Sequence, residues 1–303
     1  MSKKDIATFV VDWGTSNFRL FGLSSEGVLI DTVEAPSGLL QIKDKAFAET
    51  LEYKLEAMTS DYQNIPVLMA GMVGSASGWK EVPYVAAPAS VSDVINNAIS
   101  FELPWGAQAR ILPGVSYRAA PLNCDVMRGE EVQIFGLSLL TDSTNMHVVL
   151  PGTHSKHVDI KGGAISSFST FFTGELYALL SHYSSVKPPL PSQEIVNETA
   201  FLKGVRRTTE GALLNDIFSA RALRLFGELA DHEVADYLSG ILIGSELHSS
   251  THRNIYLVGG ESLCARYELA AKELQIETYT FSGNTCFLNG IARIIKEIEN
   301  GQR

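Results

Sequence analysis

The chain has 303 residues, of which 45% are hydrophobic and 19% are charged, so it is long enough for two domains and its composition excludes a disordered chain. Its 24 basic and 34 acidic residues give a net charge of −10, which disfavours nucleic acids and anionic membranes as main partners. An anionic ligand therefore has to be held by local groups.

The amino terminus has two lysines but no long apolar region, so it does not predict a signal peptide. The most apolar stretch, residues 237–247, is broken by Glu246 and two serines, which argues against a membrane span. Cys124, Cys264 and Cys286 are widely spaced without a paired ligand pattern, which suits a reducing cytoplasm and argues against zinc. We expect a soluble, cytoplasmic protein.

The first informative stretch is VVDWGTSNFRLFGL, residues 10–23. A buried strand delivers Asp12 into a turn, and a second strand turns back. Exposed amides and hydroxyls at such a tip suit phosphate oxygens, and a carboxylate at a strand end suits a hydrated divalent cation. Ordinary hairpin chemistry is the alternative. The small and hydroxyl residues of the turn are Gly14, Thr15, Ser16 and Asn17.

A strand at 27–33, a helix at 46–58 and a strand at 66–69 follow. The last strand leads into AGMVGSASGW, residues 70–79, whose three glycines let a loop approach a ligand closely at the carboxyl end of a strand. A surface loop without function is the alternative. A helix from residue 92 to 99 and a strand at 109–112 come next.

The second informative stretch is NCDVMRGEEVQIFGLSLL, residues 123–140. Its pattern predicts a helix with Asp125 at the N-cap and with Glu130 and Glu131 in the early turns. Asp125 is then either a cap alone or a functional carboxylate at a domain edge.

The stretch MHVVLPGTHSKHVDIKGGAISSFSTFFTGEL repeats the opening plan as strands at 148–150, 157–160 and 165–172, with a Gly162-Gly163 turn. A lysine in a glycine-led turn neutralises phosphate as a point cation, and a neutral histidine donates one hydrogen bond. An ordinary turn residue is the alternative for the histidine. The predicted turn comprises Gly152, Thr153, His154, Ser155 and Lys156.

The remainder is mostly helical, with one late strand that ends in Gly259-Gly260-Glu261. The expected elements are a helix at 173–182, a proline-rich loop at 184–193, helices at 201–206, 214–228 and 233–247, a strand at 254–258, a helix at 263–274, a strand at 276–281 and a helix at 286–298.

Two β-β-β-α halves that each open with a phosphate turn, and a late strand, Gly-Gly turn and helix, resemble the superfamily of sugar kinases, hexokinase, actin and the heat-shock ATPases. The resemblance implies an α/β fold of two ribonuclease-H-like domains, 1–125 and 126–303, with a nucleotide cleft between them. The second domain would include an interdomain helix at 126–140. Both turns would bind the phosphates of ATP, and Gly259, Gly260 and Glu261 would abut the adenosine.

More closely, the strings VDWGTSNFR, AGMVGSASGW, DVMRGEE, LPGTHSKHV and FFTGELYALLS resemble the 2-dehydro-3-deoxygalactonokinase family over nearly the whole chain. The resemblance implies ATP-dependent phosphorylation of 2-dehydro-3-deoxy-D-galactonate on O6, in galactonate breakdown. The chain departs from the family at Ser16, where threonine is expected, and at His157, where an aromatic residue is usual.

The resemblance also implies roles for single residues. Asp12 would hold Mg²⁺ through water, and Asp125 would accept the proton of the sugar-acid hydroxyl. Arg19 or Arg128 would bind the substrate carboxylate, since a guanidinium recognises it with two hydrogen bonds. Arg19 can instead serve ATP, and Arg128 can be a surface charge. Ser75, Trp79 and Glu175 would line the sugar site, with simple packing as the alternative for Trp79.

Two other functions stay open. A kinase of the same superfamily could act on a neutral sugar, another 2-keto-3-deoxy sugar acid or pantothenate, and an actin-like ATPase would hydrolyse ATP without any sugar acid. The sequence also leaves open the stereochemistry of the substrate and the oligomeric state, including a homodimer.

Overall fold

The computed structural model describes residues 5–190, 196–208 and 212–301; residues 1–4 and the 191–193 part of the predicted proline-rich loop lie outside them. The chain packs into two compact units. One comprises Met1–Thr144, Lys161–Ser167 and Thr285–Arg303, and the other Asn145–Ile160 and Phe168–Asn284. The predicted domain boundary at residues 125 and 126 stays a prediction, although residues 126–144 pack with the first unit.

The first unit is built on a six-stranded sheet with the order β3-β2-β1-β4-β7-β6. β1 pairs antiparallel with β2 and parallel with β4. Phe9, Val10 and Val11 are fully buried, which explains why this central strand reads as a continuous apolar run. The strands are β1 (Thr8–Trp13), β2 (Phe18–Leu23), β3 (Leu29–Ala35), β4 (Val67–Gly71), β6 (Ile99–Glu102) and β7 (Gln108–Ile111).

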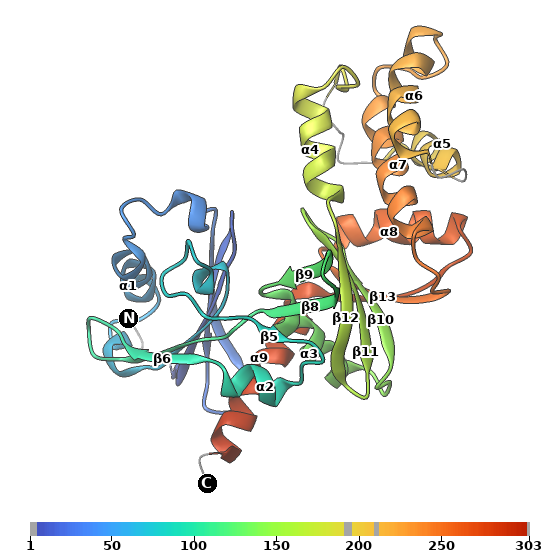
Figure 1. The fold of residues 1–303 in the computed structure, drawn as a ribbon. Helices are drawn as coiled ribbons and strands as arrows, with labels where there is room; N and C mark the ends of the chain where they lie inside the picture. The colour runs from blue at the N-terminus through green and yellow to red at the C-terminus, as the bar shows by residue number, and fades with distance from the viewer. Residues whose placement is uncertain (1–4, 191–195, 209–211, 302–303) are drawn as a thin grey trace. The chain divides into compact units, whose positions relative to one another are not determined.

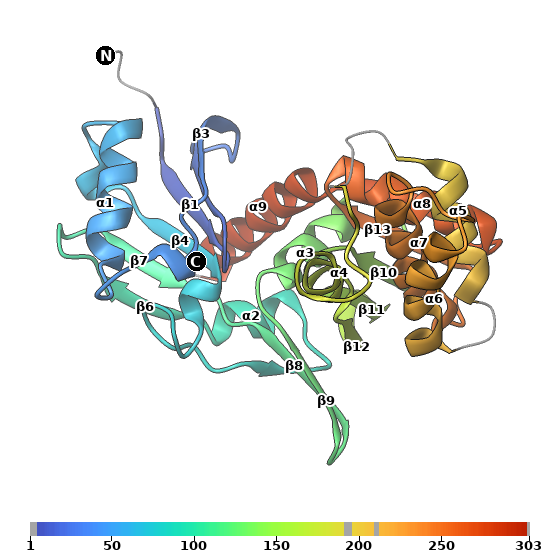
Figure 2. The same ribbon diagram turned by 90° about the horizontal axis from the view of Figure 1, so that it is seen from above.

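A second, three-stranded sheet of the first unit has the order β5-β8-β9. Its strands are β5 (Val85–Ala86), β8 (Val115–Ala120) and β9 (Asn123–Met127). Figure 2 shows the β8–β9 hairpin extending away from the six-stranded sheet. The sequence did not predict this hairpin, because its outer residues pack against little and Leu122 at its tip is fully exposed.

The helices of the first unit follow the predicted spacing where they cover a core. α1 (Phe47–Met58) buries Phe47, Leu51, Leu55 and Met58 on one face. The other elements are α2 (Val91–Asn96), α3 (Glu130–Leu140), α9 (Gly283–Gly301), and the short 3-10 helices η1 (Leu39–Gln41), η2 (Tyr62–Asn64) and η3 (Met72–Gly74).

α3 and α9 approach so closely that side chains do not fit between them. A Cβ on Gly136 would lie 1.7 Å from the carbonyl oxygen of Cys286, and one on Gly290 would lie 2.0 Å from that of Val132. This backbone contact is the physical reason why the predicted interdomain helix and the carboxyl-terminal helix pack in one unit.

The second unit repeats the first sheet's plan with the order β12-β11-β10-β13-β14, in which β10 is antiparallel to β11 and parallel to β13. The predicted duplication is thereby confirmed. Gly162 and Gly163 have φ values of 58° and 78°, as a tight turn between β11 and β12 requires. The strands are β10 (Met146–Leu150), β11 (Ser155–Lys161), β12 (Ala164–Phe171), β13 (Asn254–Gly259) and β14 (Glu277–Ser282).

Within the described residues, five helices complete the second unit, with α5 and α6 packed against α7 (Figure 1). Phe201, Ile243 and Tyr267 join the sheet residue Leu257 in one buried core. Among the described residues, we find no helix with the length and apolar character to cross a bilayer. The helices are α4 (Thr173–Tyr183), α5 (Glu198–Arg207), α6 (Leu213–Leu225), α7 (Val234–His248) and α8 (Glu261–Glu273).

Candidate functional site

The carboxyl ends of β1 and β4 meet at one edge of the first sheet, because the two strands are parallel neighbours with Asp12 opposite Ala70. The first predicted phosphate turn, 14–17, therefore lies beside the glycine-rich loop 71–79. This edge is where α/β sheets place their binding sites.

Backbone hydrogen bonds from the segment 38–40 hold the first turn on one side. Three of its carbonyl oxygens accept hydrogen bonds from the amides of residues 38–40, at 3.0–3.2 Å. Thr15, Ser16 and Asn17 are exposed. With these carbonyls occupied, the turn presents hydroxyl and amide groups to solvent, which suits the oxygens of an anion.

Asp12 and Arg19 are directly opposite each other on β1 and β2 and form an ion pair. Arg19 Nε donates to Asp12 Oδ2 at 3.0 Å, and a second guanidinium nitrogen contacts the same oxygen. The other carboxylate oxygen, Oδ1, lies beside Gly71. This position requires glycine, because its φ is 91° and a Cβ there would lie 2.8 Å from Trp13 O. The two residues proposed for metal and substrate are thus each other's partners.

Loop 71–79 folds back on itself. The amide of Trp79 donates to Val73 O at 2.9 Å, and Ser75 is buried with its Oγ 3.3 Å from Ser77 Oγ. The indole of Trp79 stacks on Phe47 with ring centroids 6.1 Å apart. Its ring thus packs against the core of the first unit, as the packing alternative expects, and a substrate contact stays a prediction.

Arg128 is buried, in the segment between β9 and α3. One terminal nitrogen donates to Val82 O at 2.7 Å, and the guanidinium lies 4.2 Å from the centre of the Tyr84 ring. Within the described part of the chain, its Nε and Nη1 have no hydrogen-bond partner. Burying a guanidinium whose N–H groups lack hydrogen-bond acceptors costs free energy of folding, so a purely structural role does not account for it. The surface-charge alternative for Arg128 is wrong.

Glu131, in the first turn of α3, is also fully buried. Its Oε2 accepts from the amide of Gly129 at 2.7 Å, but Oε1 has no partner among the described residues. Burial, reinforced by the neighbouring charge of Glu130, raises the pKa of Glu131 to about 8. At neutral pH this carboxyl is therefore mostly protonated.

Asp125 is not the N-cap of a helix, and that prediction is wrong. It lies in β9 opposite Tyr117, and its Oδ1 accepts from the amide of Val126 at 2.7 Å. α3 begins at Glu130, after Gly129 with a φ of 110°. The acidic side chains of Glu130 and Glu131 accept the amides of residues 128 and 129 and take over the capping role. The catalytic assignment of Asp125 stays a prediction.

The second turn lies at the carboxyl end of β10 and contacts the start of α4. The amide of Glu175 donates to Thr153 O at 2.9 Å, and a Cβ on Gly174 would lie 2.4 Å from Gly152 O. His154 Nε2 is 2.5 Å from a carboxylate oxygen of Glu175, and both side chains are exposed. The structure thereby brings the predicted turn and Glu175 together.

Ser155 and Lys156 are strand residues of β11 and not part of the turn, so this part of the prediction is wrong. Both are buried, and Lys156 Nζ donates to Thr170 Oγ1 at 2.8 Å. Ser155 Oγ donates to Glu246 Oε1 at 2.6 Å, a partner that is remote in sequence. A phosphate contact by either residue stays a prediction.

Glu246, on α7, is the buried acceptor behind the second turn. Besides Ser155, it accepts hydrogen bonds from His157 Nε2 at 2.8 Å, from Tyr267 OH at 2.7 Å and from Thr173 Oγ1. Burial and the Glu246 charge raise the pKa of Tyr267 well above its usual value, so the phenol stays a donor. His157, the departure from the family's aromatic residue, is thus one of four donors to this carboxylate.

The late Gly-Gly turn lies beside the second turn. β13, the parallel neighbour of β10, ends at Gly259, and α8 begins at Glu261 with Gly260 as its N-cap. A Cβ on Gly259 would be 3.7 Å from the carbonyl oxygen of Pro151. Two of the predicted ATP-binding segments therefore meet within the second unit.

Sequence reasoning missed Glu131 and Glu246. Glu246 is a lone carboxylate within an apolar helical stretch, and that isolation is a signal that could have marked it, whereas Glu131 follows Glu130 and reads as an ordinary acidic residue of a first helix turn. That isolation does not reveal the partners, which come from other strands and helices.

The chain matches known proteins over nearly its whole length. The family model for 2-keto-3-deoxy-galactonokinase matches residues 12–294. The 2-dehydro-3-deoxygalactonokinase of Escherichia coli (strain K12) is 35% identical over 298 residues, which are 96% of this chain and 98% of that protein. A Rhizobium meliloti (strain 1021) protein with the same assigned activity is 30% identical over 95% of this chain and 96% of its own length.

Solved structures agree. A crystal structure of a Sinorhizobium meliloti protein assigned as a 2-dehydro-3-deoxygalactonokinase has a TM-score of 0.87 and 29% identity, over 96% of this chain and 99% of that chain. The activator of 2-hydroxyisocaproyl-CoA dehydratase from Clostridium difficile, with a TM-score of 0.52 and 12% identity over 97% and 96% of the two chains, shares the fold alone. The predicted α/β fold of the actin-like ATPases is confirmed, and the chain belongs to the 2-keto-3-deoxy-galactonokinase family.

Proposed function

We propose that this protein transfers the γ-phosphoryl group of ATP to O6 of 2-dehydro-3-deoxy-D-galactonate. The observation that carries the proposal is family membership across residues 12–294, with relatives of that name at 30–35% identity. The acceptor is a sugar acid, and an acidic chain needs a local cation to bind it. Three free cysteines suit the reducing cytoplasm in which we place the reaction.

The ATP phosphates are bound by the first turn and by the second turn with the start of α4. Both turns offer exposed hydroxyl or imidazole groups, and the N-terminus of a helix favours negative charge. The late turn at Gly259, Gly260 and Glu261 lies on the adenosine side. This assignment follows the family resemblance, and the contact between Gly259 and Pro151 supports it for the second unit.

Asp12 would hold Mg²⁺ through water. A single partly exposed carboxylate fits this ion, which keeps most of its waters and shares phosphate oxygens. Bound Mg²⁺ would neutralise the oxygens of the triphosphate. Arg19 already pairs with Asp12, so its guanidinium would move to the phosphates when the ion binds.

Arg128 is the better candidate for the substrate carboxylate. Arg19 is paired with Asp12, whereas Nε and Nη1 of Arg128 lack partners in the described residues. Nη1 lies close to Gly74, since a Cβ there would be 2.8 Å away, so loop 71–79 must shift to admit a carboxylate. The neighbour of Nε on its side of the guanidinium is Nη2, which already donates to Val82 O, so the carboxylate would take single charge-assisted hydrogen bonds from Nε or Nη1.

Asp125 would accept the proton of O6 as phosphoryl transfer proceeds. The hydroxyl becomes acidic only during the transfer, so an ordinary carboxylate is a sufficient base. The contact with the Val126 amide occupies one oxygen, and substrate binding must direct the carboxylate towards the hydroxyl.

The deciding experiment is a coupled ADP-release assay over 2-keto-3-deoxy sugar acids, neutral sugars and pantothenate. We expect turnover with 2-dehydro-3-deoxy-D-galactonate, and a loss of about 10²–10⁴-fold in kcat for Asp125→Asn while ATP still binds. Asp142→Asn, an exposed acid of the same unit, is the matched control. Near-normal turnover of Asp125→Asn would refute its role, and a preference for a neutral alcohol, or ATPase activity indifferent to sugar acids, would refute the substrate.

Arg128→Lys tests the carboxylate contact. The variant keeps the charge but loses the planar fork, so we expect KM for the sugar acid to rise about 10-fold or more while KM for ATP stays unchanged. Arg110→Lys, on β7, is the control. An equal change in both KM values would indicate a general packing defect, which tryptophan fluorescence of the first unit would reveal.

A further inference from the structure

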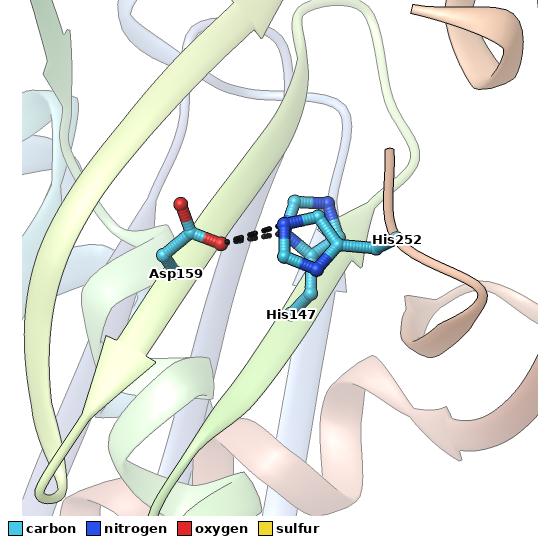
Figure 3. A group of neighbouring side chains, drawn as sticks. All are labelled: His147, Asp159 and His252. Atoms are coloured by element: carbon cyan, nitrogen blue, oxygen red, sulfur yellow. Dashed lines mark hydrogen bonds and ion pairs between the residues drawn. The ribbon is translucent and has the colours of Figure 1, made fainter. Parts of the chain in front are cut away.

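A cluster of three side chains in the second unit lies outside the site described above. His147 on β10 and Asp159 on β11 are opposite each other in the sheet, and His252 comes from the loop between α7 and β13. His147 Nδ1 is 2.8 Å and His252 Nε2 is 3.2 Å from the same oxygen, Asp159 Oδ1. The two imidazoles stack at 3.8 Å and direct these nitrogens towards that oxygen (Figure 3).

The far side of His147 is held by a chain of hydrogen bonds. His147 Nε2 is 3.3 Å from His157 Nδ1, and His157 Nε2 is 2.8 Å from Glu246 Oε1. The Glu246 carboxylate accepts, so His157 Nε2 carries a proton. The second nitrogen of His147 is thus linked through His157 to a buried carboxylate.

Two imidazole nitrogens thus converge on one carboxylate oxygen, His147 Nδ1 at 2.8 Å and His252 Nε2 at 3.2 Å. Together the three side chains offer two nitrogens and one oxygen, which are ligand atoms that zinc takes from histidine and aspartate. A cation placed among these atoms would contact all three side chains.

We propose that His147, Asp159 and His252 bind a divalent transition-metal ion of the zinc class. The three ligand atoms lie within 4.8 Å of one another. Metal–ligand bonds of about 2.1 Å in a tetrahedron place ligand atoms about 3.4 Å apart, slightly wider than the 2.8 and 3.2 Å seen here. His252 lies in a loop and can tilt out of the stack to point its lone pair at the ion.

The donor set and its surroundings favour zinc, cobalt or nickel over magnesium. Imidazole nitrogens suit these metals, whereas Mg²⁺ prefers oxygen ligands. The side chains of Asp159 and His252 are 34% and 43% exposed, which leaves a path for the ion and room for a water ligand. The link from His147 through His157 to Glu246 is the carboxylate–histidine support that orients metal ligands.

The site revises the expectation against zinc, which considered only the cysteines. His147 and Asp159 are twelve positions apart and meet across two antiparallel strands, while His252 is remote in sequence. No short ligand motif therefore marks the site.

The test is a titration of tag-free, EDTA-treated full-length protein with ZnCl₂, followed by calorimetry, all in a Cys124→Ser background that removes the exposed thiol. We expect one equivalent of zinc to bind. His252→Ala and Asp159→Asn should weaken binding 100-fold or more, and His232→Ala, an exposed histidine of the same unit, should leave it unchanged. Zinc should also raise the thermal midpoint of the parent protein but not that of His252→Ala.

His157→Phe installs the aromatic residue that is usual in the family. It removes the supporting histidine and with it one of the four donors to Glu246. Loss of such support should weaken zinc binding about 10–100-fold. The inference is overturned if the parent protein binds no zinc at micromolar concentrations, or if His252→Ala and Asp159→Asn bind it as tightly as the parent. Zinc binding is measured without ATP or sugar acid, so a protein that binds no zinc would not count against the proposed kinase function.

Discussion

The hairpins that open the two units share a topology and differ in the charge behind their turns. Asp12 stands two residues before Gly14 at the end of β1, whereas Leu150 occupies the corresponding place before Gly152 at the end of β10. Arg19 faces Asp12, while Lys156 faces Leu150. The duplication therefore repeats the backbone plan and not the side-chain chemistry, and of these two positions only the one in the first hairpin has a carboxylate.

The buried glutamates of the two units differ in the same way. Glu246 accepts four hydrogen bonds, so its charge is dispersed over donors from three strands and helices. Glu131 has one donor to Oε2 and none to Oε1 among the described residues. Two buried carboxyl groups thus differ in their partners: Glu246 is hydrogen-bonded by several donors, whereas the pKa of Glu131 is raised by burial.

Of the variants that test the comparison of the two hairpins and the two glutamates, Asp12→Asn has the largest expected effect on the rate. If the metal belongs to the first turn, kcat should fall about 10²–10³-fold and the Mg²⁺ concentration for half-maximal rate should rise. The measurement is the ADP-release rate across a magnesium series. Leu150→Met, at the corresponding position of the second hairpin, should leave that dependence unchanged. An unaltered magnesium dependence in Asp12→Asn would remove the distinction between the turns.

Glu246→Gln should lower the free energy of unfolding by about 2–4 kcal/mol, because the new amide group faces donors that then lack an acceptor. Far-UV circular dichroism in urea follows this change, since helices α4–α8 belong to the second unit. Glu228→Gln, an exposed residue between α6 and α7, should shift the curve little. Equal curves for Glu246→Gln and Glu228→Gln would show that the four hydrogen bonds contribute no net stability.

Local patterns predicted most of the fold. Strands and amphipathic helices show a repeating hydrophobic pattern within a few neighbouring residues, and turns are marked by glycine. Both hairpins and the sheet repeat could therefore be predicted. The β8–β9 hairpin could not, since a strand without a covered face lacks that period. Asp125 was assigned to a helix N-cap for this reason, because a polar residue that precedes a helical pattern is a good N-cap candidate. Only the pairing of β9 with β8 shows that Asp125 lies in a strand.

The candidate site residues could be predicted only where they lie together in one short segment of the chain. The two turns and the Gly-Gly segment were found because each is a short run of glycine and hydroxyl residues. Ser155 was assigned to a turn because its partner Glu246 is 91 residues away. The His147 cluster, too, depends on strand register, which side-chain types along the chain do not specify.

Glu131→Gln sharpens the comparison of the buried glutamates through an effect that depends on pH. Because the pKa of Glu131 is raised from 4.5 to about 8, the folded chain keeps a proton that the unfolded chain has released. This stabilisation is fully present below pH 4.5 and is lost as the pH rises through 8, by up to about 1.4 kcal/mol per pH unit. Glutamine stays neutral, so the wild-type protein should lose stability relative to the variant across this window.

Tryptophan fluorescence in urea measures this difference, because Trp13, Trp79 and Trp105 all belong to the first unit. Glu130→Gln is the graded control: removing the neighbouring charge should lower the pKa of Glu131 and move the window to lower pH without abolishing it. A pH-independent difference between wild type and Glu131→Gln would mean that the carboxyl ionises at its ordinary pKa. The unpaired Oε1 would then have to be solvated in the folded chain, and the contrast with Glu246 would be one of geometry alone.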